Sequence, residues 1–357
     1  QQQQNLILKP YSYHREAGSK MTIDLYPEIV RQQDLSPDVG FGTEIDEDCK
    51  TIYDATKGFG ANKQRVIDTL ATKDATERWK LCKRYPEVYA DSKKSNLAEL
   101  MKSEFSGDFG RAMTMLAMPL DEAECYMLKK ATDGIGCNVP VIYSILCGRT
   151  NTEINLVKKN YFKLYSKDLG QLMASELHGD VENLVLNAIQ AGEETYDPQY
   201  HTEQKAREDA ELIYRKGQGK LGTDEKSIFK TICASPPEHI LNINKIYTDK
   251  YDVTLKKAVE KELSGKVRDG CLHLVGMKLK PFETIAKLVD KACVGIGTDE
   301  LLLTCTIIRY QHVMKEVMSA HIELFGKTIH DRVREETSGP YKTVLLTILN
   351  SVWPEAG

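Results

Sequence analysis

The sequence lacks a marked excess of charge of either sign. It has 48 lysines and arginines against 52 aspartates and glutamates, which gives a formal net charge of −4 at pH 7. Nucleic-acid backbones and anionic lipid surfaces attract proteins through a surplus of lysine and arginine, and this chain has no such surplus. We therefore expect no nucleic-acid partner, and no membrane binding that rests on the protein's own net charge.

The sequence also lacks any long hydrophobic run. No stretch approaches the roughly 20 apolar residues of a membrane-spanning helix. The N-terminal stretch QQQQNLILKPYSYHREAGSK has neither the basic start nor the long apolar segment of a secretory signal peptide. Hydrophobic residues nevertheless make up 41% of the 357 positions, enough for a sizeable core in two to three domains. These features predict a cytoplasmic protein without a signal peptide or transmembrane segment.

No two cysteines form a C-x-x-C pair, although the chain has nine cysteines. Several lie inside apolar helical runs such as SILCGR, TICAS and LLLTCTII, which is typical of buried, reduced thiols in a reducing compartment. Cys137 differs, because it follows Gly136 in a polar loop. We predict that Cys137 is an exposed thiol that can link two copies of the chain under oxidising conditions.

Motifs of catalysis are missing as well. The chain contains no H-E-x-x-H and no G-x-S-x-G, and its lone S-x-x-K tetrapeptide, SIFK, lies in a helical segment. The stretch KGQGKLGTDEKS, residues 216–227, does contain G-x-G-x-x-G. A dinucleotide site would need a strand before these glycines, but the preceding AREDAELIYRK has the pattern of a helix. A P-loop is excluded because Leu221 follows Lys220 where serine or threonine is needed. We expect no enzyme.

What the sequence does contain is a repeat. Four glycine loops, each followed by a polar segment and an apolar run, occur as ATKGFGANKQRVID, ATDGIGCNVPVIYS, KGQGKLGTDEKSIFK and ACVGIGTDELLLTC. Their last glycines, Gly60, Gly136, Gly222 and Gly297, are 76, 86 and 75 residues apart. A second block follows each loop, and its carboxylates are Glu104, Glu176, Glu262 and Glu336, which lie 44, 40, 40 and 39 residues after those glycines. Repeats of this length indicate stacked structural units.

The segments around the loops have a helical period. Before the fourth loop, Phe282, Ile285 and Val289 recur at steps of three and four residues. After it, Thr298 is placed to cap the next helix, with Asp299 and Glu300 in the first turn. Alternating β-branched runs bounded by turns are few, so strands are not expected. The sequence therefore predicts an all-α fold of four helical units of about 75 residues.

The boundaries of these units follow from the repeats and from turn-forming residues. Prolines and glycines punctuate the first part of the chain, which predicts a largely extended head with little core of its own. The extra length in the second period lies in the polar segment AGEETYDPQYHTEQKA. We predict a head at 1–45, repeat I at 46–119, repeat II at 120–190, a linker at 191–205, repeat III at 206–280 and repeat IV at 281–357.

The repeated pair of a glycine loop and a carboxylate has a specific chemistry. Glycine tolerates dihedral angles that turn several backbone carbonyls to one side, and carbonyl oxygens are hard ligands that suit Ca²⁺. Three carbonyls and a bidentate carboxylate supply about five of the six to eight oxygens that Ca²⁺ takes. Water or a headgroup phosphate can complete such an open shell. The alternative is that the glycines only end helices and that the glutamates are surface charges. This alternative could explain a single loop and carboxylate, but it does not explain why the pair recurs four times at matched spacing.

These loops, together with the S-E-L-x-G and E-T-S-G blocks about 40 residues later and the long second linker, resemble the annexin family. The resemblance covers roughly residues 46–353. It implies four repeats of about five helices each, arranged in a slightly curved disc with the calcium loops on its convex, membrane-facing side. It also implies calcium-dependent binding to anionic phospholipid membranes, with membrane organisation or scaffolding as the role.

The resemblance implies a ligand set in each repeat. The fourth repeat matches the family pattern best, and the third matches least, because Lys220 stands at the first loop glycine. The implied ligands are Thr56, Gly58, Gly60 and Glu104 in the first repeat, Thr132, Gly134, Gly136 and Glu176 in the second, Gln218, Gly222 and Glu262 in the third, and Cys293, Gly295, Gly297 and Glu336 in the fourth. The residues between the glycines are Phe59, Ile135, Leu221 and Ile296. Such apolar side chains either pack inward or enter the membrane interface.

A second function stays open at this point. A helical-repeat scaffold that binds cytoskeletal or other proteins, with weak or lost calcium dependence, would have the same periodicity. The irregular first and third loops favour this alternative, and the four matched carboxylates favour calcium-dependent membrane binding.

Overall fold

The computed structural model describes residues 22–31, 41–58, 60–90, 95–134, 136–217 and 224–354. All regular secondary structure in these ranges is helical, with 21 α-helices and one 3₁₀ helix. The predicted all-α fold is therefore confirmed. The described ranges contain no helix with the length and apolar character that crossing a bilayer requires.

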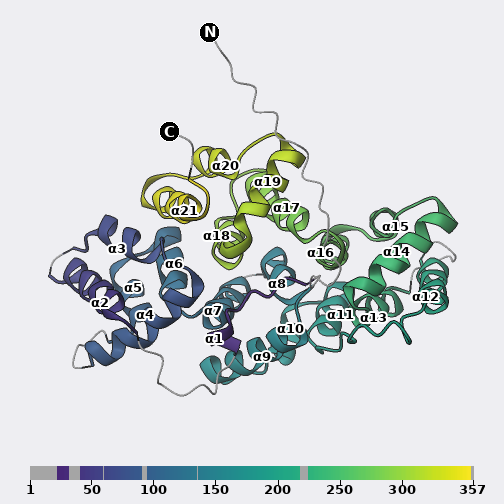
Figure 1. Ribbon diagram of the computed structural model, residues 1–357, viewed down its shortest axis with the longest axis horizontal. Helices are drawn as coiled ribbons and strands as arrows, with labels where there is room; N and C mark the ends of the chain where they lie inside the picture. The colour runs from purple at the N-terminus through teal and green to yellow at the C-terminus, as the bar shows by residue number, and fades with distance from the viewer. Residues whose placement is uncertain are drawn as a thin grey trace, which may run out of the picture.

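After the short helix α1 (Glu28–Arg31), the α-helices follow one another in four groups of five (Figure 1). The first group is α2 (Thr43–Thr56), α3 (Lys63–Leu70), α4 (Ala75–Val88), α5 (Leu97–Glu104) and α6 (Gly107–Leu116). The second is α7 (Leu120–Thr132), α8 (Val139–Leu146), α9 (Asn151–Tyr165), α10 (Leu169–Glu176) and α11 (Gly179–Ala188). The third is α12 (Glu203–Lys216), α13 (Glu225–Ala234), α14 (Pro237–Tyr251), α15 (Leu255–Glu262) and α16 (Gly265–Leu279). The fourth is α17 (Pro281–Cys293), α18 (Glu300–Arg309), α19 (Met314–Phe325), α20 (Ile329–Glu336) and α21 (Gly339–Val352), with η1 (Gln311–Val313) between α18 and α19.

The groups pack around a common centre, which Figure 1 shows near α7, α8 and α18. Helix α18 of the fourth group contacts α6 of the first group and α7 and α8 of the second. Helix α21 contacts α3 and α6, and α16 contacts α8 and α11. The chain thus closes on itself, with its last helix against its first group.

The core follows the helical stripes of the sequence. In α17, Ile285 and Val289 of the predicted stripe are buried and Phe282 is partly buried against the same core, with Ala286 and Ala292 buried beside them. Burying one such isoleucine or valine side chain contributes about 1.5–3 kcal/mol to the stability of the fold. This packing stabilises short helices that would not form in isolation.

The second helix of each group begins at a polar cap directly after the glycine loop. The caps are Asn62, Asn138, Asp224 and Asp299, and each side chain accepts a hydrogen bond from a backbone N–H in the first turn. The prediction that Thr298 caps α18 was wrong by one residue. Asp299 is the cap, because its carboxylate accepts from Leu302 N at 2.9 Å while the Thr298 hydroxyl is engaged elsewhere.

Two connecting segments are tied to the helical groups. In the head, Leu25, Tyr26 and Val30 are buried in the main core. Between α11 and α12, Glu193 exchanges backbone hydrogen bonds with the Asn151 side chain, and its carboxylate lies 2.6 Å from Lys278 Nζ. The connection therefore joins the second and third groups through specific contacts.

Candidate functional site

Each glycine loop connects the first and second helices of its group. In each of the three loops whose glycines are described, both glycines have a positive φ, which costs conformational energy for residues with a side chain. These are Gly58 (96°) and Gly60 (82°), Gly134 (105°) and Gly136 (81°), and Gly295 (130°) and Gly297 (83°). The sequence needs glycine at these six positions because a Cβ would strain the backbone there.

A backbone hydrogen bond closes each loop. The pairs are Asn62 N to Ala55 O, Asn138 N to Ala131 O and Asp299 N to Ala292 O, all at 2.8 Å and all seven residues apart. In the third group the bond runs from Asp224 N to Lys216 O at 2.9 Å, eight residues apart. The third loop is thus one residue longer, which a comparison of glycine positions alone does not reveal. Its residues Gln218, Leu221 and Gly222 lie outside the described ranges.

The four predicted carboxylates occupy equivalent positions. Each is the last residue of an eight-residue helix, namely Glu104 of α5, Glu176 of α10, Glu262 of α15 and Glu336 of α20. The chain is extended at the next residue in all four cases. The repeat found in the sequence is therefore a repeat of backbone position.

In the fourth group the loop and the carboxylate meet. The Thr298 hydroxyl lies 3.2 Å from both the backbone oxygen and the Oε2 atom of Glu336. The Glu336 charge also reaches Cys293 at the start of the loop, where burial first and this carboxylate second raise the pKa of the thiol to about 12. The cysteine is therefore a neutral thiol at pH 7, and its backbone oxygen is the ligand candidate.

In the second group Cys137 takes the place of Thr298. Its thiol donates to the backbone oxygen of Glu176 at 3.5 Å, so the loop contacts the same segment through a weaker donor. Cys137 is only partly exposed, and the prediction of an exposed thiol was wrong for this reason. Burial raises the pKa of Cys137, which lowers its reactivity further.

The first and third groups differ from the second and fourth in the residues that border the loop and the carboxylate. Ala61 stands at the Thr298 position of the first loop and has no hydroxyl to donate. The Thr56 hydroxyl donates within its own helix, to Ile52 O at 2.9 Å. In the third group Glu262 Cγ lies 3.4 Å from the point where a Cβ on Gly217 would sit, so this side chain borders the start of the longer loop.

The donor set of these loops suits a hard cation. The described ranges contain no cluster of three or more histidine, cysteine, aspartate or glutamate side chains that could hold a metal ion. What the fourth group brings together is one carboxylate and a loop whose glycines free backbone carbonyls. Oxygen donors of this kind fit Ca²⁺, and the absence of thiolate or imidazole clusters in these ranges does not fit a structural zinc site.

Two apolar side chains of the fourth loop extend into solvent. Ile296 is 110% exposed relative to the reference state, and Val294 is 60% exposed. Of the two readings of the residues between the glycines, inward packing is excluded for Ile296. Phe59, Ile135 and Leu221 lie outside the described residues.

The second and fourth loops are joined directly. The Asn138 side chain donates to both carboxylate oxygens of Asp299, at 3.0 and 2.8 Å. Both residues also cap the helices that follow their loops. The two loops are therefore held beside one another.

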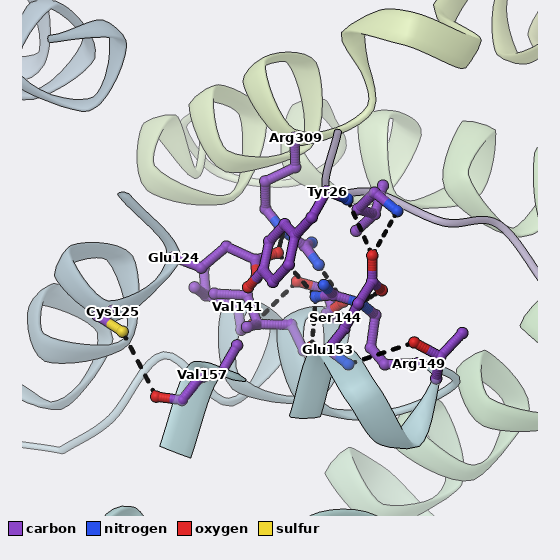
Figure 2. Close-up of polar contacts among 12 residues, drawn as sticks. Tyr26, Glu124, Cys125, Val141, Ser144, Arg149, Glu153, Val157 and Arg309 are labelled. Carbon is purple, nitrogen blue, oxygen red and sulfur yellow. Dashed lines mark hydrogen bonds and ion pairs between the residues drawn. The ribbon is translucent and has the colours of Figure 1, made fainter. Parts of the chain in front are cut away.

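A buried polar cluster at the opposite ends of α7 and α18 from their glycine loops was not predicted from the sequence. Figure 2 shows Arg149, Arg309 and Tyr26 turned toward the Glu124 carboxylate. Arg309 Nε and Arg149 Nη1 lie 2.6 and 2.8 Å from Glu124 Oε1, and the Tyr26 hydroxyl donates to Oε2. Burial alone would raise the pKa of Glu124, but the two arginines outweigh it and the pKa is lowered. The cluster joins α7, α18 and the head.

A second carboxylate extends this cluster. Glu153 Oε1 accepts from the backbone N–H groups of Leu25 and Tyr26 at 2.7 and 2.9 Å, and Oε2 lies 2.9 Å from Arg149 Nε. The only signal in the sequence is a charged residue at an otherwise apolar helical position, as with Arg309 after LLLTCTII. The partners come from helices far apart in the chain, so local patterns do not reveal them.

Comparison with known proteins agrees with this geometry. The family model described as Annexin matches residues 47–116, 123–188 and 208–274. The chain is 28% identical to Annexin A13 of Homo sapiens over 311 residues, which cover 87% of this chain and 96% of that protein. It is 28% identical to Annexin A7 of Dictyostelium discoideum over 304 residues, which cover 85% of this chain but only 64% of that longer protein. Among solved structures, annexin III superposes with a TM-score of 0.78 at 24% identity, covering 92% of this chain and 98% of that one.

Proposed function

The chain belongs to the annexin family, a family of non-enzymatic membrane-binding proteins, and we propose that it binds anionic phospholipid membranes in a calcium-dependent manner. The observation that carries the proposal is the meeting of loop and carboxylate in the fourth group, where the Thr298 hydroxyl lies 3.2 Å from Glu336 Oε2. A distant carboxylate held beside a glycine loop is what an oxygen-lined Ca²⁺ site needs.

In this proposal the fourth group holds the ion with the carbonyls of Cys293, Gly295 and Gly297 and the carboxylate of Glu336. Thr298 orients that carboxylate. The second group uses Thr132, Gly134, Gly136 and Glu176 in the same way, and the first uses Thr56, Gly58, Gly60 and Glu104. The third, with Gln218, Gly222 and Glu262, has the longer loop and is expected to bind most weakly.

Bound Ca²⁺ supplies positive charge at a surface whose protein carries a net charge of −4. The chain's own residues contribute the rest. The loop carbonyls leave part of the coordination shell open to a lipid phosphate, and Ile296 offers an exposed apolar side chain to the interface. If lipid completes the shell, calcium and membrane each strengthen the binding of the other.

We further propose that the protein is cytoplasmic and becomes peripheral on membranes when calcium binds. Its nine cysteines all lie in described positions and none is in a disulfide there, which supports a reducing compartment. A dimer linked through Cys137 stays a prediction that non-reducing gels after oxidation can test. Because this thiol is partly buried and donates to Glu176 O, we expect only slow dimer formation.

Sedimentation with phosphatidylserine vesicles across a calcium titration tests the proposed function. The variants are Glu104→Gln, Glu176→Gln, Glu262→Gln and Glu336→Gln, and the matched control is Glu323→Gln, an exposed glutamate of α19 outside the loops. We expect Glu336→Gln to need several-fold more calcium than wild type for vesicle binding, and the control Glu323→Gln to need the same calcium concentration as wild type. An unchanged calcium requirement in Glu336→Gln would refute the site. Wild-type protein that never sediments with vesicles would refute the function and favour a protein-binding scaffold, for instance on the cytoskeleton.

A further inference from the structure

A cavity of about 280 Å³ lies between the third and fourth helical groups, and one of its lining residues, Lys291, also borders the fourth glycine loop. Helices α15, α16 and α17 form its walls, and Tyr143 of α8 adds a ring from the second group. Helix α16 contacts α8, α15 and α17 (Figure 1). The cavity does not contain any ligand proposed for calcium, so its chemistry is separate from that of the loops.

A buried histidine lines this cavity. His273 is only 4% exposed, and neither of its ring nitrogens has a hydrogen-bond partner in the described part of the chain. Its ring packs 5.4 Å from that of Tyr143. Burial, with the positive charges of Arg309 and Lys256 next, lowers the pKa of His273 to about 3. At neutral pH the imidazole is therefore uncharged, and because both of its nitrogens are buried, the ring contributes an uncharged surface to the cavity wall.

Two lysines of the cavity have no counter-ion. Neither Lys256 of α15 nor Lys287 of α17 forms an ion pair or a side-chain hydrogen bond with any described residue. Burial first and the charge of Lys287 second lower the pKa of Lys256. The other charged groups of the wall are already paired, Glu260 with Lys257 at 2.7 Å and Asp269 with Lys291 at 2.9 Å. The wall thus carries two lysines without a direct ion-pair partner in the described ranges, although the charges of Glu283 and Glu260 act on Lys256 from a distance.

The corresponding cavity between the first and second groups shows that this imbalance is specific. It lies against α5, α6 and α7 and is also lined by cations. There every cation is paired, Lys102 with Glu99, Lys129 and Lys130 with Asp133, and Arg111 with Asp108. At this equivalent position every lining cation has a direct partner, with four cations sharing three carboxylates, whereas Lys256 and Lys287 have no direct partner in the described ranges.

The remaining wall is apolar. Leu272 and Leu288 line the cavity beside the ring of Tyr143. Two ammonium groups and a neutral imidazole next to such a wall suit a ligand with a compact anionic head and a short organic part. The volume of about 280 Å³ is smaller than that of typical drug-sized sites, which limits the ligand to a small molecule or to the head of a larger one.

We propose that this cavity is a binding site for a phosphate monoester, whose phosphate oxygens accept hydrogen bonds from Lys256 and Lys287 beside the neutral ring of His273. The organic part lies against Leu272 and Leu288. The phosphate comes either from a small soluble ester or from a lipid headgroup with a terminal phosphate. Binding needs no calcium, because the loop carbonyls and carboxylates take no part in it.

Isothermal titration calorimetry in EGTA tests the proposal with three probes, namely inorganic phosphate, glycerol 3-phosphate, and vesicles of phosphatidylcholine with phosphatidic acid. The variant Lys256→Gln/Lys287→Gln removes both charges, and the control Lys163→Gln removes an exposed lysine of α9 in the second group. We expect saturable binding of glycerol 3-phosphate, tighter than that of inorganic phosphate. The double variant should bind at least about tenfold more weakly, as for loss of one charge-assisted hydrogen bond, and the control should bind unchanged. Competition between glycerol 3-phosphate and the vesicles would identify the lipid headgroup as a source, and vesicles that bind no better than pure phosphatidylcholine would assign the site to the soluble ester.

The wild-type protein gives a second measurement that does not depend on any variant folding. The imidazole ¹⁵N resonances of His273 should shift on addition of glycerol 3-phosphate, with the same affinity as in calorimetry. The proposal is overturned if glycerol 3-phosphate shows no saturable binding at concentrations up to about 10 mM, which is roughly a thousandfold above a dissociation constant of about 10 μM. Equal weakening in Lys163→Gln, or binding without a shift of His273, would also overturn it. Because all these measurements are made without calcium, their failure leaves calcium-dependent membrane binding untouched.

Discussion

Replacement of Ile296 by serine tests whether the fourth loop enters the membrane. The side chain is 110% exposed in the free protein, so its whole apolar surface is available for burial. Full burial of an isoleucine side chain contributes about 1.5–3 kcal/mol, and about 1.4 kcal/mol corresponds to a factor of ten in affinity. A loop that reaches only the interface realises the lower end of this range. We therefore expect Ile296→Ser to weaken calcium-dependent vesicle binding by about tenfold.

The substitution leaves folding intact because Ile296 has no packing to lose. Its melting temperature should match that of the wild type, since exposed substitutions usually change stability by less than about 0.5 kcal/mol. The assay is vesicle sedimentation at saturating calcium with increasing lipid. Leu241→Ser is the matched control, because Leu241 is an apolar residue of α14 that is 46% exposed and lies outside the loops. Equal lipid affinity in wild type and Ile296→Ser would refute membrane insertion of this loop, and equal losses in both variants would point to general surface hydrophobicity.

Three further substitutions test the backbone, the buried cluster and pH. Gly297→Ala places a Cβ on a residue with φ of 83°, which costs about 1–2 kcal/mol in the loop. Calcium affinity measured by calorimetry should therefore fall several-fold, while the melting temperature stays near that of wild type. An unchanged calcium affinity would contradict this expectation. Glu124→Gln leaves Arg309 buried without a carboxylate and Arg149 with Glu153 alone, so denaturant unfolding should show a loss of about 3–5 kcal/mol, and a loss below 1 kcal/mol would be inconsistent with the cluster. Burial and then the charge of Glu122 raise the pKa of Asp121 to about 6. A raised folded-state pKa contributes stability that is present at about pH 4 and lost as the pH rises through about 6. Asp121→Asn should therefore gain stability over wild type between pH 4 and pH 7, by up to about 3 kcal/mol, and a gap in melting temperature that does not widen over this range would refute the assignment.

The sequence was sufficient for features that depend on local order. The stripes of α17, the glycine loops and the carboxylates all follow from residue spacing, because helix period and backbone freedom are set within a few residues. The helix in AREDAELIYRK, which excluded a dinucleotide site, is α12 in the structure. Local periodicity was therefore enough for the fold class.

Features that depend on distant contacts were not predictable. Thr298 fits the pattern of a helix cap, yet its hydroxyl lies beside Glu336, which is 38 residues away. The partial burial of Cys137 arises in the same way from Glu176, 39 residues away. The third loop was judged by Lys220 at a glycine position, whereas the closing hydrogen bond shows a loop with one more residue. Glu124 and Arg309 are 185 residues apart, and nothing in either local sequence identifies the other as its partner.

The proposed function depends on coupling between calcium binding and membrane binding, and a calorimetric calcium titration with and without phosphatidylserine vesicles measures this coupling. The open shell proposed at Glu336 predicts that vesicles tighten calcium binding, and that calcium tightens vesicle binding by the same factor. Glu336→Gln should reduce that factor and Glu323→Gln should preserve it. A calcium affinity that is the same in the presence and absence of vesicles would contradict the account.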